Sequence, residues 1–144
     1  MNRRSATIIA ATIFAGSVCA AGIWKEDPQV LACSPAAVGP NGKIVLELGP
    51  KHGRELAIRR HSDGVWFFLV VQAAPREMKS LMSRAEFAKA RRVVLEPSVT
   101  GYAWVEGRGN EKIFTTAGKY SVHVSDVLES ERGGHTCTIT YTPS

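Results

Sequence analysis

Short segments of alternating apolar and polar residues, separated by clusters of glycine, proline, asparagine or aspartate, recur through most of this chain. In residues 43–48, for example, Ile44, Leu46 and Leu48 fall on one side of an extended backbone. Alternation with a period of two is typical of strands that bury one face, and turns at this spacing are typical of sandwiches. The pattern predicts a single all-β domain, an antiparallel sandwich or flattened barrel of about seven or eight strands.

Three consecutive segments, residues 43–48, 54–60 and 65–71, predict a β-meander. Ser62-Asp63-Gly64 separates the last two, and an Asp-Gly pair accepts the positive φ that a tight hairpin needs. Residues 65–71 form a continuous run of apolar side chains, rich in aromatic and β-branched types. Such a run predicts a central strand that is buried on both faces.

One short helix is expected. Ser83 and Glu86 match a capping box, in which the serine hydroxyl and the glutamate carboxylate accept hydrogen bonds from free N–H groups at a helix start. Phe87 and the residues after it fit a helix that ends before Val93.

The first twenty residues have the three parts of a secretory signal peptide. Arg3 and Arg4 precede an uncharged run, residues 6–14, and a series of small residues ends at Ala20. The run is shorter than the roughly 20 apolar residues that span a bilayer, so a cleaved peptide is favoured over an uncleaved anchor. A lipid-modified Cys19 is a further alternative, but the residues before it depart from the usual lipoprotein pattern.

Cleavage after Ala20 would leave residues 21–144 as one exported domain, periplasmic or secreted, with no transmembrane segment. This domain would keep two cysteines, Cys33 and Cys137. In an oxidising compartment such a pair most simply forms a disulfide, and closing a loop of about 100 residues contributes up to ~4.7 kcal/mol in the chain-entropy model. The alternative is two buried free thiols.

The residue patterns of common catalytic and metal sites do not occur in the sequence. There is no GxSxG or SxxK motif, and the four histidines lack metal-ligand spacing. Glu129 and Glu131 lie close enough in sequence to act as acid and base on a glycosidic bond, although a charged loop tip is the simpler interpretation. We expect no enzyme activity, metal or cofactor, and we keep this loop as a further candidate for a binding contact.

Positive charge is concentrated in residues 43–92, which carry 11 basic and 5 acidic side chains. Arg59, Arg60, Arg91 and Arg92 are the candidates for a basic face that would attract an acidic protein or an anionic polymer of the cell envelope. The alternative is a set of solvated charges scattered over the surface. Nucleic acid is not expected as a partner, because the aromatic residues 66–68 fall in a predicted core strand and export removes the chain from the cytoplasm.

Tyr102 and Trp104 are the other candidates for binding. They share one face of the segment 99–106, opposite Val99, Gly101, Ala103 and Val105. If the small and β-branched face packs inward, two large aromatic side chains are exposed on a strand, as in many protein or glycan contacts. The reverse orientation would bury both rings.

The segment from Ser98 to Gly107 resembles the bacterial periplasmic inhibitors of c-type lysozyme. These are small exported β-barrels with a terminal disulfide and two short motifs, one rich in serine, glycine and tyrosine, the other containing tryptophan, lysine and glycine. The resemblance implies an exported inhibitor fold. It covers about ten residues, its spacing differs, and Glu106 stands where that family has lysine, so the chain is not assigned to it.

These features favour an exported binding protein of the cell envelope that docks another protein, in the manner of an inhibitor or an immunity protein that neutralises a toxin or hydrolase. The alternative is a structural or assembly protein that binds cell-wall polymer or the outer membrane through the basic face. Both assignments rest on architecture and on the missing motifs, so they depend on the site that the structure presents.

Overall fold

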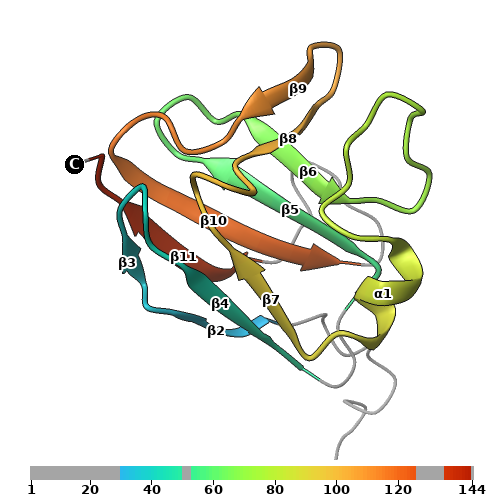
Figure 1. Cartoon of the computed structure of the whole chain (residues 1–144), viewed down its shortest axis with the longest axis horizontal. Coiled ribbons are helices and arrows are strands. Elements are labelled where there is room, and N and C mark those ends of the chain that lie inside the picture. Colours follow the sequence, from blue (N-terminus) through green and yellow to red (C-terminus); the bar gives the residue numbers. More distant parts are fainter. Residues whose placement is uncertain (1–29, 50–52, 126–134, 144) are drawn as a thin grey trace, which may run out of the picture.

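The computed structural model describes residues 30–49, 53–125 and 135–143, and these residues form two sheets and one short helix (Figure 1). The larger sheet has the order β3(Ala37–Val38), β11(His135–Tyr141), β10(Gly118–Ser125), β5(Glu55–Arg60), β6(Trp66–Val70), β8(Tyr102–Val105) and β9(Gly109–Lys112). The smaller sheet has the order β2(Val30–Ser34), β4(Ile44–Leu48) and β7(Arg92–Leu95), and the helix is α1(Arg84–Lys89).

The all-β sandwich is confirmed. Neither sheet closes on itself, and the inward side chains of the two sheets pack together in a single apolar core. The described residues contain ten strands rather than seven or eight, and one of the additional strands, β3, is only two residues long. Strand pairing is antiparallel except between β3 and β11.

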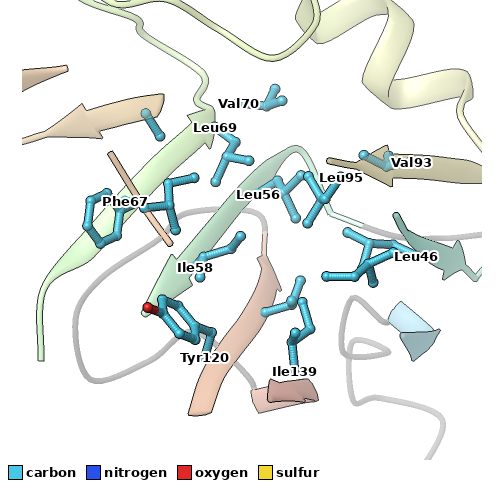
Figure 2. Packing of buried hydrophobic residues seen from close by; sticks show 14 of the residues in the cluster. Leu46, Leu56, Ile58, Phe67, Leu69, Val70, Val93, Leu95, Tyr120 and Ile139 are labelled. Atoms are coloured by element: carbon cyan, nitrogen blue, oxygen red, sulfur yellow. The ribbon is translucent and has the colours of Figure 1, made fainter. Parts of the chain in front are cut away.

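The core lies between the two sheets (Figure 2). Leu46 and Leu95 come from the small sheet, while Ile58, Phe67 and Ile139 come from the large one, and all five are fully buried. Each belongs to a strand in which buried side chains alternate with more accessible ones for at least part of its length, as the period-two pattern predicts.

The predicted disulfide between Cys33 and Cys137 is present. Cys33 lies on β2 of the small sheet and Cys137 on β11 of the large sheet, so the bond ties the two layers together across 104 residues of sequence. The signal peptide predicted for residues 1–20 lies outside the described residues.

The predicted β-meander is wrong. The strand β4 pairs with β2 and β7 in the small sheet, and only β5 and β6 form a hairpin. The hairpin turn has the predicted chemistry: Gly64 has a φ of 73°, and the Asp63 carboxylate accepts a hydrogen bond from the Val65 N–H at 3.2 Å. Alternation shows which face of a strand is buried but not which strand lies beside it, so it could not show that the chain changes sheets after Leu48.

The capping box is also confirmed. The Ser83 hydroxyl accepts a hydrogen bond from the Glu86 N–H, and the Glu86 carboxylate accepts one from the Ser83 N–H, both at 3.0 Å. The hydrogen bond from the Ser83 N–H to the carboxylate holds the pKa of Glu86 below its ordinary value. The helix is six residues long, and it packs on the core through Phe87, which is fully buried.

Three segments differ in detail from the prediction. The strand expected over residues 99–106 is shorter, because the Val99 and Thr100 N–H groups bond to the Glu96 carbonyl in a turn, which leaves Val99 71% exposed. The pattern after the turn at residues 107–110 predicts a short strand over residues 112–115, whereas the structure has this strand at Gly109–Lys112. Finally, Phe68 on β6 is only half-buried, so the strand predicted to be covered on both faces is fully covered on one.

Candidate binding site on the outer face of the large sheet

The large sheet has an outer face, the side turned away from the small sheet. Its residues alternate along each strand with the core residues. On the four adjacent strands β10, β5, β6 and β8, the outer face consists of Ser121 and His123, Ala57 and Arg59, Trp66 and Phe68, and Tyr102 and Trp104. The small sheet packs on the opposite, inner face across the core, so side chains and loops shape the outer face.

Tyr102 and Trp104 take the orientation that leaves aromatic rings toward solvent. Ala103 and Val105 point inward and are buried, whereas Tyr102 is 61% exposed and Trp104 is half-buried. Trp104 stands directly opposite Phe68 on β6, with their Cα atoms paired in the ladder. Cross-strand partners lie about 4.5–5.5 Å apart at their Cβ atoms, so Phe68 and Trp104 are neighbours on this face and together form an aromatic floor, with Tyr102 on the same side of β8. We call these three residues the aromatic surface.

A pocket of about 310 Å³ opens on the aromatic surface. Phe68 and Trp104 line it from the sheet, and the loop that follows β6 supplies another wall. The described lining residues are Glu55, Phe68, Val71, Ala73, Pro75, Trp104 and Glu106. The volume suits a single side chain or a small ligand, since pockets for drug-sized molecules start at about 300 Å³.

The loop wall is held in place by hydrogen bonds to the sheet. The Leu81 N–H donates to the Leu69 carbonyl of β6 at 2.9 Å. On the other side, the Asn110 amide of β9 donates to the Glu77 carbonyl at 3.0 Å and accepts from the Lys79 N–H at 3.2 Å. The loop that leaves β6 is therefore tied back to the sheet at residues 77–81, so less ordering of this wall would be needed when a ligand binds.

Two carboxylates line the pocket at opposite ends of the aromatic floor. Glu55 begins β5 and accepts a hydrogen bond from the Gln72 N–H, just beyond the end of β6, at 2.7 Å. Glu106 follows β8, which runs antiparallel to β6, so it lies toward the start of β6. Glu55 is buried and Glu106 is exposed. The pocket thus combines an aromatic floor with negative charge.

A polar cluster occupies the neighbouring part of the outer face. The Trp66 ring lies 4.6 Å from the His123 ring, centroid to centroid, and His61 Nε2 is hydrogen-bonded to the Ser121 hydroxyl. Ser121 and His123 are both buried, and the contacts with His61 and Trp66 hold these two side chains in place. Within residues 30–49, 53–125 and 135–143, no three histidine, cysteine or acidic side chains are grouped as metal ligands would be.

Arg60 was predicted to belong to a basic face, and this placement is wrong. Arg60 is only 7% exposed because its alternation along β5 turns it toward the protein interior. Its guanidinium donates to the carbonyls of Lys112 and Ile113, at 3.2 and 2.8 Å, and to the Thr115 hydroxyl at 2.9 Å. It also forms an ion pair with Asp63 at 2.8 Å. This hydrogen-bonded pairing holds the pKa of the Asp63 carboxyl below its ordinary value of 3.8.

The remaining arginines do not form one surface. Arg59 is exposed on β5 of the large sheet, whereas Arg92 lies on β7 of the small sheet beside the exposed Arg91. Arg92 also forms an ion pair with Glu47, its cross-strand neighbour, at 3.0 Å. The structure therefore separates the predicted basic residues into different places. Glu129 and Glu131 lie outside the described residues.

Of the seven described residues that line the pocket, sequence reasoning proposed only Trp104 as a binding residue, and it missed the aromatic Phe68 and the carboxylates of Glu55 and Glu106. Phe68 was assigned to a core strand, although the alternation of Phe67 and Leu69 as inward residues would have turned Phe68 outward. Glu55 follows in the same way from the inward Leu56 and Ile58. Phe68 and Glu55 come close to Trp104 only because β6 pairs with β8. These two strands are separated by more than thirty residues of sequence.

Among the residues that the structure describes, no helix has the length and apolar character needed to cross a bilayer. Comparisons of the chain with protein-family models, with curated proteins and with solved structures find no match.

Proposed function

We propose that this chain is an exported binding protein whose aromatic surface docks another protein. The observation that carries the proposal is the exposed Tyr102 beside Trp104 and its pocket on a rigid sheet. Tyrosine and tryptophan are enriched among the residues that dominate binding free energies, especially next to pockets that exclude water. They offer a large contact area and lose little conformational entropy on binding.

The scaffold suits such a role. The disulfide links the two sheets, and the loop wall of the pocket is hydrogen-bonded back to the large sheet, so the surface is largely formed before a partner arrives. Preorganisation of this kind raises affinity because less ordering is needed on binding. An inhibitor or immunity-like protein, which must hold a toxin or hydrolase tightly, is the class of binding protein that we favour.

Docking on an anionic envelope polymer through arginines is the second interpretation that the sequence left open. No observation favours it, since Arg60 is buried and Arg59 lies in a different sheet from Arg92. It remains a measurable outcome: reversal of Arg59, Arg91 and Arg92 to glutamate would abolish polymer binding, whereas it would mainly slow association of a protein held by aromatic side chains.

Tyr102→Ala and Trp104→Ala are each expected to weaken the complex with the protein partner by about 2 kcal/mol, roughly 30-fold in Kd. Most of the change should be faster dissociation, because contacts of this kind form only once the two proteins have docked and therefore have little effect on the association rate. Surface plasmon resonance of the purified complex measures both rates. Val94→Ala is the matched control, since it shortens an exposed apolar side chain on the small sheet. Equal affinity of all three variants and the wild type would rule out the aromatic surface as the docking site.

A further inference from the structure

We infer that the pocket on the aromatic surface receives a cationic side chain, lysine or arginine, from the docked protein. The inference rests on the proposed function and specifies the chemistry of the partner: a basic residue at the centre of its contact. Three observations on the pocket lead to this class of ligand: the aromatic floor, the two carboxylates and the size.

The aromatic floor attracts cations. A tryptophan face is the most favourable aromatic partner for an ammonium or guanidinium group, which binds within about 6 Å of the ring centroid. Phe68 adds a second ring directly across the ladder from Trp104, and both rings line the pocket. The methylene stem of a lysine or arginine would pack against the same rings and against Val71, Ala73 and Pro75.

The two carboxylates of the pocket favour a ligand with positive charge. Glu55 and Glu106 lie at opposite ends of the aromatic floor, so an ion on the floor would experience both. An anionic ligand would be repelled at each end. A purely apolar ligand would displace water from the exposed Glu106 carboxylate without offering a donor in return, which costs free energy. A cation compensates for that loss, and its attraction to the carboxylates strengthens as water leaves the pocket.

The size of the pocket is consistent with one long side chain. A volume of about 310 Å³ is at the lower limit for drug-sized molecules. The chain as a whole carries a formal net charge of +5, so long-range attraction does not direct cations to this protein. The recognition would be local, and a basic residue would bind only when the rest of the partner positions it over the pocket.

The test is a titration of the full exported chain, labelled with ¹⁵N, with Nα-acetyl-lysine amide, followed by NMR. We expect saturable shifts confined to the Trp104 indole N–H and to the backbone of Phe68 and Glu106, with a Kd in the millimolar range for so small a probe. Nα-acetyl-norleucine amide, which has no ammonium group, should bind at least about tenfold more weakly. Equal binding of the two probes, or shifts located elsewhere, would overturn the inference.

Glu106→Gln separates the charge from the shape of the pocket. The side chain is exposed, so the substitution should leave the fold intact, which a thermal unfolding curve checks. The variant should bind the lysine probe at least about threefold more weakly, with norleucine binding unchanged. Glu47→Gln removes the same charge on the small sheet and should have no effect on either probe. Undiminished lysine binding by Glu106→Gln would contradict the role of this carboxylate.

The two proposals can fail separately. If the lysine probe does not bind but Tyr102→Ala still weakens the protein complex, the cation preference is wrong and protein docking stands. If the lysine probe binds as expected but neither aromatic substitution affects the complex, the partner docks elsewhere, and the pocket is a site for cations that protein docking does not use.

Discussion

Arg60→Met is expected to lower the free energy of unfolding by about 3 kcal/mol. The substitution keeps an apolar stem near Phe67, whose ring centroid lies 4.8 Å from the guanidinium carbon, but removes every donor. The carbonyls of Lys112 and Ile113 would lose their charged partner, and Asp63 would lose its counter-ion. Hydrogen bonds to a charged group contribute about 1.5–3 kcal/mol each, and leaving buried acceptors unpaired adds to the loss.

Arg59→Met is the matched control, because Arg59 is the neighbouring residue on the same strand but is exposed. Its effect should stay within about 0.5 kcal/mol. Urea unfolding of the three proteins at pH 7 measures the difference. Similar stability of both variants would show that the buried Arg60 network does not stabilise the fold.

The pH dependence provides an independent readout of the same network. The pKa of Asp63 is lowered in the folded chain, so its pairing with Arg60 stabilises the protein above the ordinary value of 3.8 and is lost as the pH falls through the folded value. Asp63→Asn should therefore be less stable than the wild type at pH 7, and the difference should shrink below pH 3.8. A difference that persists unchanged in acid would exclude the ion pair as its cause.

Cys33→Ser is expected to destabilise the chain by about 2–5 kcal/mol, and Cys137→Ser by a similar amount. Each removes the one covalent link between β2 and β11 that the described residues contain, and each frees a thiol in the other position. Chemical unfolding together with thiol titration of the denatured proteins measures both consequences. The double variant Cys33→Ala/Cys137→Ala controls for the free thiol. Wild-type stability in the double variant would show that the link between the sheets is dispensable.

Local chemistry in the sequence was sufficient for the parts of the fold that depend on near neighbours. Ser83 and Glu86 are three residues apart, and the capping box forms as the pattern indicates. The Asp63-Gly64 turn forms for the same reason. The disulfide was predictable at long range only because the predicted export, with loss of Cys19 in the predicted signal peptide, left one simple pairing.

The order of the strands in the sheets and the position of the pocket could not be predicted from near neighbours in the sequence. The pairing of β4 with β7 instead of β5 depends on a chain that crosses between layers, and alternation carries no signal for it. Arg60 looked like a surface cation because charge patterns ignore the inward register of its strand. Glu55, Phe68 and Trp104 come from three separated strands, so their meeting at one pocket depends on the completed sheet.

The most direct test of docking on the aromatic surface is site-specific photocrosslinking in the cells that produce the protein. A photoreactive phenylalanine analogue at position 102 is close in shape to tyrosine, and the same analogue at position 94 reports on the exposed side of the small sheet. We expect a discrete protein adduct from position 102, none from position 94, and loss of the adduct when Trp104→Ala is added. A protein adduct from position 94 alone, or one from position 102 that Trp104→Ala leaves undiminished, would contradict the account.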